Sequence, residues 1–175
     1  LAPGLDRMTA LTGRPFLGTL PWVRGLGIDG EDSLALDAPR SVKPPIGRDV
    51  LQVAVARFGR ISNFTDFDAL AHEPGVSVRF TESADELLEA DLAVLPGTKA
   101  TVADLKLMRT RGLDAALAER ARRGLPILGI CGGYQMLGGR IEDGIESGEA
   151  VVQGLGLLPV ETVFERDKVL ARPEG

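Results

Sequence analysis

The sequence predicts an α/β fold built on a mostly parallel sheet with helices on both faces. Short apolar runs of strand length alternate with stretches of helical spacing, as in a doubly wound sheet. Runs without polar alternation are typical of parallel strands that are buried on both faces. We expect such strands at residues 49–56, 76–80, 92–95 and 126–130, and a last strand at 158–164.

Helix signals separate these strands. Ser83 is a suitable N-cap for a helix over residues 84–89, and Glu86 occupies the capping-box position. The apolar residues of 101–123 recur near helical spacing and are interrupted at Gly112. Each strand is therefore expected to be followed by a helix that returns the chain to the sheet.

The first 47 residues have a different character. Residues 5–12 are expected to form a short helix that ends at Gly13, and residues 15–22 a short apolar strand closed by a proline. Residues 23–47 are rich in glycine, proline and acidic side chains, which indicates a linker. The chain thus has room for one domain and a fragment of another.

Composition excludes several classes of protein. Hydrophobic residues make up 44% and charged residues 26% of the 175 residues, as in ordinary globular domains. The net charge of −5 argues against nucleic-acid binding, and Arg120, Arg122 and Arg123 are expected to be the solvated end of a helix. No apolar run approaches the roughly 20 residues of a membrane span. With one cysteine and no possible intrachain disulfide, a cytoplasmic location is expected.

Residues 128–135 have the layout of a nucleophile elbow, in which a reactive side chain lies on a sharp strand-to-helix turn. An apolar strand is followed by Cys131, and then Gly132 and Gly133 open the next helix. Gly129 and Gly133 leave room for the chain to fold tightly around a residue with a strained backbone. The pattern predicts an exposed, reactive cysteine.

Two properties are expected of Cys131. Amide groups at a helix N-terminus favour an anion, so the thiolate should be accessible near neutral pH. The N–H of Gly132 can donate to the oxyanion that forms when a thiolate attacks a carboxamide. The alternative is a small core hydrophobe, as most lone cysteines are, and the strand–Cys–Gly–Gly context disfavours it.

A second candidate loop follows the third expected strand, at residues 95–101. Ligands of open α/β sheets bind at the carboxyl ends of strands, so the N–H groups of Gly97 and Thr98 could supply further oxyanion donors. The alternative is an ordinary turn in which Thr98 or Thr101 caps the next helix. Capping and function can coexist in one loop.

No metal or nucleotide site is expected in this chain. Neither glycine cluster continues into the Gly-Lys-Ser/Thr of a phosphate loop, and no cysteine–histidine group has the ligand count for zinc. Asp29, Glu31 and Asp32 could be imagined as a Mg²⁺ site. Because nothing holds these carboxylates together, we expect a solvated linker instead.

Residues 129–135 (GICGGYQ) and 96–99 (PGTK) resemble the class I glutamine amidotransferase domain of the cobyric and cobyrinic acid amide synthases. Residues 60–68 (RISNFTDFD), with 18–22 (GTLPW) and 31–34 (EDSL) before them, are most similar to the cobyric acid synthase branch of this family. The resemblance covers nearly the whole chain.

The resemblance implies a class I glutamine amidotransferase-like (flavodoxin-like) fold that is incomplete at its C-terminus. Residues 1–22 would be the C-terminal remnant of an ATP-dependent synthetase domain, 23–47 a linker and 48–175 a partial glutamine amidotransferase domain. A synthetase domain absent from this chain would bind ATP and Mg²⁺ and activate side-chain carboxylates of a corrin, adenosylcobyrinic acid a,c-diamide. Ammonia from glutamine would convert them to amides, giving cobyric acid for cobalamin biosynthesis.

The resemblance also implies roles for single residues. Cys131 would be the nucleophile, Gly97, Thr98 and Gly132 would frame the oxyanion, and Gln135 would help to hold the glutamine. From its position alone, Gln135 is only a polar residue on the first helical turn after the elbow, where side chains are more often solvated.

The chain departs from the family in its histidine. The family's catalytic histidine lies well downstream of the cysteine, whereas the single histidine here, His72, precedes Cys131 and is expected in a surface loop. We therefore expect this chain alone to have weak or no glutaminase activity. Cys131 should still react with an electrophilic glutamine analogue.

Two other functions are kept open. A glutaminase subunit that feeds a cell-wall (Mur-ligase-like) amidating enzyme has a similar Cys-Gly-Gly-Tyr-Gln elbow, but residues 1–47 look like the end of a fused synthetase. A non-catalytic α/β binding module is compatible with the missing histidine. The sequence offers no mechanism for residues 63–68, and docking against the synthetase domain is a hypothesis only.

Overall fold

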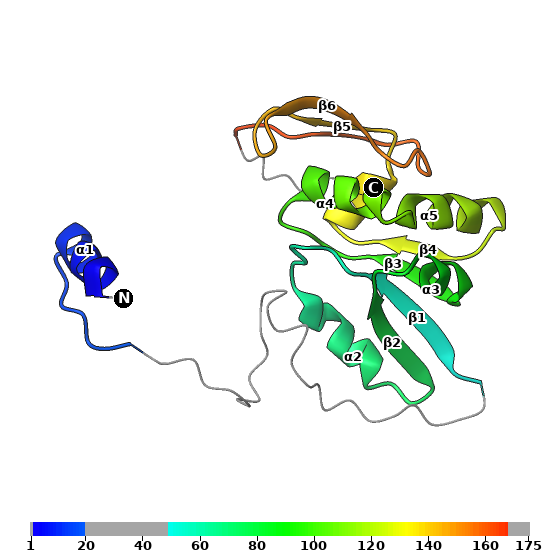
Figure 1. The fold of residues 1–175 in the computed structure, drawn as a ribbon, viewed down its shortest axis with the longest axis horizontal. Helices are drawn as coiled ribbons and strands as arrows, with labels where there is room; N and C mark the ends of the chain where they lie inside the picture. Colours follow the sequence, from blue (N-terminus) through cyan, green and yellow to red (C-terminus); the bar gives the residue numbers. More distant parts are fainter. Residues whose placement is uncertain (1, 20–48, 168–175) are drawn as a thin grey trace, which may run out of the picture.

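A four-stranded parallel sheet lies at the centre of the domain (Figure 1). The computed structural model describes residues 2–19 and 49–167. The strand order β2-β1-β3-β4 is the one found in flavodoxin-like folds, so the predicted fold class is confirmed. The four predicted strands are present within two residues of their expected ends: β1 (Leu51–Ala56), β2 (Val76–Thr81), β3 (Leu92–Leu95) and β4 (Ile127–Gly129).

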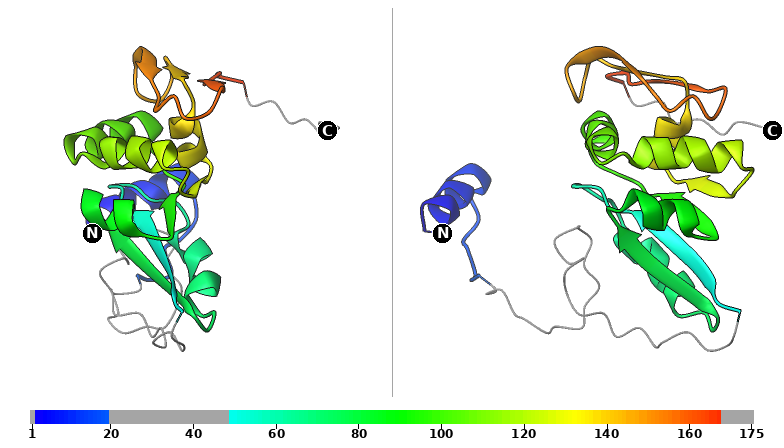
Figure 2. Two further views of the ribbon diagram at one scale, coloured as in Figure 1. Left: turned by 90° about the vertical axis from the view of Figure 1, so that its right-hand side faces the viewer. Right: turned by 45° about the vertical axis from the view of Figure 1, so that its right-hand side comes forward.

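Helices cover both faces of this sheet (Figure 2). Successive strand residues point to opposite faces: Ala54 packs with the side chains of α3 to α6, whereas Val53 and Val55 pack with Phe67 below. Among the described residues, no helix is both long and apolar enough to cross a bilayer. The elements that pack on the sheet are the 3₁₀ helix η2 (Phe64–Phe67) and α2 (Asp68–Ala71) on one face, and α3 (Ala84–Glu89), α4 (Thr101–Thr110), α5 (Leu113–Arg122) and α6 (Gly132–Leu137) on the other.

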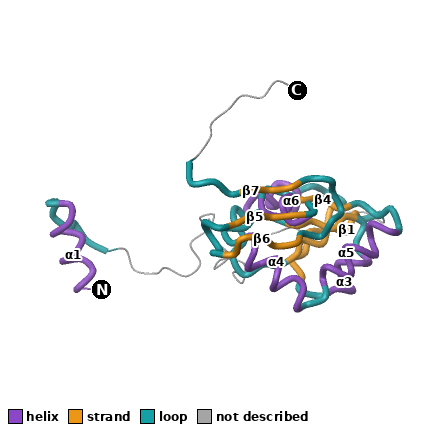
Figure 3. The backbone as a smooth tube through the Cα atoms, turned by 90° about the horizontal axis from the view of Figure 1, so that it is seen from above, coloured by secondary structure: helices purple, strands orange, loops and turns teal. Residues whose placement is uncertain are grey.

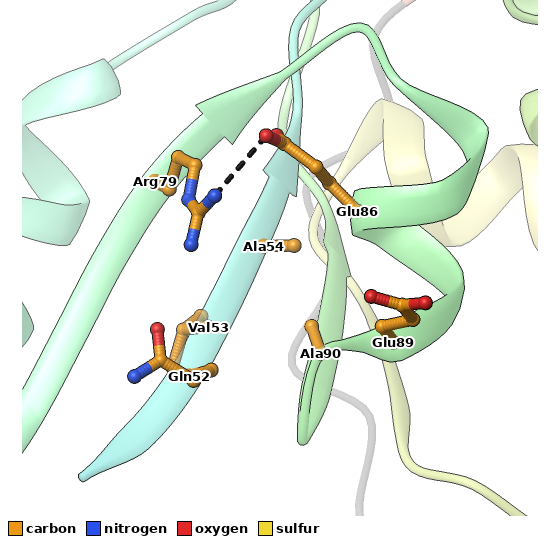
Figure 4. Close-up of a pocket in the computed structure, with 7 residues that line it drawn as sticks. All are labelled: Gln52, Val53, Ala54, Arg79, Glu86, Glu89 and Ala90. Carbon is orange, nitrogen blue, oxygen red and sulfur yellow. Dashed lines mark hydrogen bonds and ion pairs between the residues drawn. The ribbon is translucent and has the colours of Figure 1, made fainter.

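The helix boundaries follow the local signals. Ser83 caps α3, because its hydroxyl accepts a hydrogen bond from the amide of Glu86 at 3.4 Å. The reciprocal half of the capping box does not form, because the Ser83 amide donates to the Thr81 hydroxyl at 2.9 Å. The Glu86 carboxylate instead pairs with Arg79 at 3.1 Å (Figure 4). Gly112, at φ 70°, separates α4 from α5 where the helical spacing breaks.

The N-terminal segment contains one helix and no strand among its described residues. Helix α1 spans Ala2–Thr12, longer at its start than the expected helix over residues 5–12. The strand expected at residues 15–22 is wrong for 15–19, and residues 20–22 lie outside the described ranges. A strand needs a neighbour for its backbone hydrogen bonds, and Leu17 is 97% exposed here. The expected linker over 23–47 also lies outside the described residues.

A second, three-stranded sheet covers α4 and α6 and was missed by the sequence reasoning, apart from its last strand (Figure 3). Its inner face places Ile141 and Val152 in the main core. Arg109 of α4 donates to the carbonyl oxygens of Gln153 at 2.7 Å and Gly154 at 3.0 Å, which ties the sheet to the helix. The strands are β5 (Arg140–Asp143), β6 (Glu149–Gln153) and β7 (Glu161–Val163), in the order β6-β5-β7, and β7 lies within the strand expected at 158–164.

Arg120 was expected to be solvated, but this prediction is wrong: the residue is completely buried. Burial lowers the pKa of its guanidinium, while the nearby Asp91 carboxylate raises it. Arg122 keeps the expected exposed position and pairs with Glu119 at 2.6 Å. Charge at Arg120 is tolerated because its two terminal nitrogens, Nη1 and Nη2, donate to the main chain, although its buried Nε has no partner among the described residues. The acceptors are the carbonyl oxygens of Leu87, Leu88, Ala90, Asp91 and Pro126.

Replacing Arg120 by Met should lower the free energy of unfolding by about 3 kcal/mol or more, because buried carbonyl groups lose their donors. The matched Arg122→Met variant should lose far less stability, as exposed ion pairs contribute little. Urea denaturation of both variants measures the difference. Equal losses would contradict the role assigned to Arg120.

The Asp143 carboxyl should make the free energy of unfolding depend on pH in the acid range. Its burial favours the neutral form, but hydrogen bonds from the Glu146 amide, the Ser147 side chain and amide, and the Ile145 amide outweigh burial and lower the pKa. The carboxylate therefore stabilises the fold above the unfolded pKa of about 4, and this contribution is lost as the pH falls through the lower folded pKa.

This dependence can be read from urea denaturation of the unchanged chain and an Asp143→Asn variant between pH 6 and pH 2. The stability gap between them should stay constant above about pH 5 and shrink below about pH 4. A gap that stays constant down to pH 2 would count against the assigned role of Asp143.

Candidate functional site

The candidate site is built around a strained cysteine at the end of β4. Cys131 has φ 48° and ψ −113°, and it is one of two described non-glycine residues with positive φ. The turn around it is fixed by hydrogen bonds from Gly133 N to Ile130 O at 2.8 Å and from Gln135 N to Cys131 O at 3.0 Å. Cys131 is exposed, as expected of an elbow and unlike a core cysteine.

Two glycines allow helix α6 to approach the sheet at the distance this turn requires. A Cβ atom placed on Gly133 would overlap the carbonyl oxygen of Leu95 in β3. A Cβ atom on Gly129 would lie 2.7 Å from the Cα atom of Tyr134. Both contacts are with backbone atoms, which cannot rotate away, so only glycine fits at these positions.

The loop after β3 lies directly against the elbow. A Cβ atom on Gly97 would be 3.6 Å from the Cβ atom of Cys131. A Cβ atom on Gly132 would be 2.7 Å from the methyl carbon of Thr98 and 3.3 Å from its amide nitrogen. The structure therefore brings Gly97, Thr98 and Gly132 together with Cys131, although 33 residues separate Thr98 from Cys131.

Three backbone amides at this junction have no hydrogen-bond acceptor among the described residues: those of Gly97, Thr98 and Gly132. The antiparallel bridge between Ile61 and Thr98 explains why the Thr98 amide has no acceptor. Its two hydrogen bonds join the residues on either side of this pair, so the Thr98 N–H points away from Ile61. Free amides beside an exposed sulfur can stabilise negative charge on an oxygen atom. The arrangement is suited to thiolate attack on a carbonyl group.

Gln135 is less solvated than its position alone indicated. Its side chain is half buried, and its carbonyl oxygen Oε1 accepts a hydrogen bond from the Thr101 hydroxyl at 3.2 Å. This bond joins the first turn of α6 to the first residue of α4. Gln135 thus lies one helical turn beyond Cys131 with a fixed side chain.

Residues 60–68, for which the sequence offered no mechanism, support the loop after β3. The amide of Ser62 donates to Gly97 O at 2.9 Å, and the amide of Lys99 donates to Arg60 O at 3.0 Å. The apolar side chains that follow anchor this segment in the core, since Ile61, Phe64 and Phe67 are each at most 4% exposed. The segment therefore fixes one edge of the candidate site from within the domain.

Asp104 is a site residue that the sequence reasoning missed. Its carboxylate is 4% exposed and accepts hydrogen bonds from the Thr98 hydroxyl and, at 3.1 Å, from the amide of Gly59. A signal was present: Asp104 lies on the same helical face as Leu105 and Met108, which are completely buried. An acidic residue on an apolar face requires a partner, and the partner here is the candidate site loop.

His72 lies far from the elbow in the topology of the sheet. It is exposed at the end of α2, with Nδ1 2.6 Å from the carbonyl oxygen of Asp68. It precedes the amino end of β2, whereas Cys131 follows the carboxyl end of β4. Parallel strands place these ends at opposite edges of the sheet, so the histidine cannot serve Cys131.

The pocket in Figure 4 is also separate from the candidate site. It lies between α3 and the first half of β1, away from the carboxyl ends of the strands, and is lined by Gln52, Val53, Ala54, Arg79, Glu86, Glu89 and Ala90. The acidic group Asp29, Glu31 and Asp32 lies outside the described residues. Within the described ranges, no group of three His, Cys, Asp or Glu side chains could hold a metal ion.

The chain is similar in sequence to known proteins over its whole length. Residues 52–175 match the CobB/CobQ-like glutamine amidotransferase domain. The chain is 54% identical to the cobyric acid synthases of Streptomyces avermitilis and of Rhodococcus jostii. Both matches cover 100% of this chain, and they cover 36% and 35% of the respective relatives. The chain is also 54% identical to the cobyric acid synthase of Sorangium cellulosum, over 98% of this chain and 33% of the relative. The chain thus spans about a third of the length of these relatives.

A Gly133→Ala variant should lose stability by about 3 kcal/mol, because the added methyl group overlaps a backbone carbonyl. A matched Gly139→Ala variant should change stability by less than about 1 kcal/mol, since its methyl group would have only one neighbour, at 4.0 Å. Thermal unfolding compares the two. A Gly133→Ala variant as stable as Gly139→Ala would contradict the close approach of α6 and β3.

Proposed function

Because the chain belongs to the CobB/CobQ-like glutamine amidotransferase family, we propose that Cys131 is the nucleophile that releases ammonia from glutamine. The observation that carries this proposal is the exposed sulfur at positive φ beside the free amides of Gly97, Thr98 and Gly132. Such a turn is costly for a non-glycine residue and persists where the surrounding structure requires it.

The proposed reaction has two steps. The sulfur of Cys131 attacks the side-chain carbonyl carbon of glutamine, forming an S–C bond while the carbonyl π electrons move to oxygen. The amides of Thr98 and Gly132 donate to this oxyanion, with Gly97 beside them. The C–N bond then breaks, the thiol proton leaves with the nitrogen as ammonia, and water hydrolyses the thioester to glutamate and free Cys131.

The proton transfer needs a group that these described residues do not supply. Thiolate attack on an amide is efficient when a base takes the thiol proton and returns it to the leaving nitrogen. His72 is at the opposite edge of the sheet, so we propose that this chain alone turns over glutamine slowly. The side chain of Gln135, whose Oε1 accepts the Thr101 hydroxyl, would orient the substrate glutamine. Cys131 and the free amides would bind the side chain of that substrate.

For the whole protein we propose the activity named in its relatives, cobyric acid synthesis. Residues 1–22 would belong to an ATP-dependent synthetase domain, 23–47 to a linker and 48–175 to the amidotransferase domain. The ammonia would amidate corrin carboxylates of adenosylcobyrinic acid a,c-diamide in the cytoplasm. The described residues do not fit ATP or Mg²⁺, because they contain neither a phosphate loop nor a carboxylate cluster, so we assign both to the synthetase domain.

The alternatives are less well supported. A stand-alone glutaminase subunit would not account for the similarity of residues 1–47, since the first two relatives match the whole chain. A non-catalytic binding module would not need an exposed cysteine in a strained turn. Only the binding module predicts a different result in the labelling experiment that follows, because a glutaminase subunit would have the same reactive cysteine.

The chloroketone analogue of glutamine, in which –CH₂Cl replaces the amide nitrogen, should alkylate this chain once, at Cys131. Free glutamine should slow the labelling and asparagine should not, because the distance from the α-carbon to the carbonyl differs by one methylene. Intact and peptide mass spectrometry give the stoichiometry and the position. Ammonia release from glutamine should stay close to the uncatalysed rate.

A Cys131→Ser variant is the control, since it differs by one atom and should remain unlabelled. Labelling of this variant, or labelling that glutamine does not slow, would mean that Cys131 is not part of a glutamine site. A binding module would show that outcome.

A further inference from the structure

Asp104 is a buried carboxylate that the proposed reaction does not use directly. It lies in the first turn of α4 with 4% exposure and connects three segments of chain. Oδ1 accepts the amide of Gly59, in the loop after β1, and Oδ2 accepts the hydroxyl of Thr98, in the loop after β3. Burying a carboxylate costs free energy that these hydrogen bonds must offset.

The Thr98 side chain is held from both sides. Its hydroxyl donates to Asp104 and accepts the amide of Ala100 at 3.0 Å, which fixes the side-chain rotamer. The methyl group on the same carbon is thereby turned towards Gly132, where only a glycine leaves room for it. The peptide group that carries the Thr98 N–H is held at its carbonyl by the Ser62 amide, which donates to Gly97 O at 2.9 Å. The anchored side chain holds the same residue from its other side, so the two contacts together fix the direction of the N–H.

We propose that Asp104 is a positioning residue for the glutamine site, holding the Thr98 amide at the oxygen that becomes negative during attack by Cys131. This inference rests on the proposed function. Among the described residues, the Asp104 carboxylate bonds to Gly59 and Thr98 and not to Cys131, so it acts on the proposed site through Thr98. A displacement of about 1 Å in a donor of this kind can slow a reaction by about a hundredfold.

A purely structural role makes a different prediction. An acidic residue in the first turn of a helix interacts favourably with the helix dipole, wherever the helix lies. In that case, replacing Asp104 would lower stability and leave the chemistry at Cys131 unchanged. The two roles are separated by comparing a reagent that has a carbonyl group with one that has none.

The test uses Asp104→Asn, which keeps the shape but offers one acceptor oxygen in place of two. Reaction of Cys131 with the glutamine chloroketone depends on polarisation of its carbonyl, whereas methyl methanethiosulfonate requires only a reactive thiolate. Asp104→Asn should lower the maximal chloroketone rate by about tenfold or more and leave its half-saturating concentration within about twofold. The methanethiosulfonate rate should stay unchanged.

Two further variants keep the test decisive. Thr98→Val removes the hydroxyl, and a double Thr98→Val, Asp104→Asn variant should be no slower than the slower single variant, because both changes break the same contact. Asp143→Asn is the matched control: its carboxylate is also buried but bonds within its own loop, so it should lower stability without changing the rate ratio.

Each outcome has one meaning. The positioning role would be overturned if Asp104→Asn left the ratio of the chloroketone rate to the methanethiosulfonate rate unchanged. Additive losses of chloroketone rate in the double variant would also overturn it. If the unchanged chain itself is not labelled at Cys131 by the chloroketone, the proposed function fails instead. Rates are normalised to the folded fraction measured by circular dichroism, so a partly unfolded variant still gives a ratio.

Discussion

The close approach of α6 to β3 is the constraint on which the candidate site depends. Gly133 lies so near the carbonyl of Leu95 that no side chain fits between them. This contact leaves Cys131 with a left-handed backbone, and the same turn exposes its sulfur and leaves the amide of Gly132 free. Packing between a helix and a strand therefore sets the positions of the proposed nucleophile, Cys131, and of one proposed oxyanion donor, the Gly132 amide.

The second half of the site depends on long-range support. The loop carrying Gly97 and Thr98 is bonded on one side to residues 60–62 and on the other to Asp104. Residues 60–62 are fixed in turn by the buried aromatic rings of Phe64 and Phe67. The amides of Gly97 and Thr98 are thus held by apolar anchors and one buried carboxylate.

Local patterns predicted most of the fold and the centre of the site. The buried strands, the break at Gly112 and the elbow at Cys131 could be predicted because each depends on neighbouring residues. Strands β5 and β6 of the second sheet could not, since residues 140–153 contain many polar side chains and buried residues alternate with half-buried ones along β5. Burial of Arg120 was missed for another reason: its partners are carbonyl groups, which every sequence has and no motif marks. The partnership of Asp104 with Thr98 and Gly59 likewise exists only in three dimensions.

Helix α6 is short, and its carboxyl end is completed by another part of the chain. The carbonyl oxygens of Met136, Leu137 and Gly138 accept hydrogen bonds from amides of residues 155–158, which lie between β6 and β7 of the second sheet. A helix of six residues has too few internal hydrogen bonds to persist by itself. Residues 155–158 therefore hold the carboxyl end of the helix whose amino end follows Cys131, and we call them the clasp. Inserting residues into this clasp would break the hydrogen bonds that hold the carboxyl end of α6 and so destabilise the turn at Cys131. A longer turn at residues 144–148 would leave these hydrogen bonds intact.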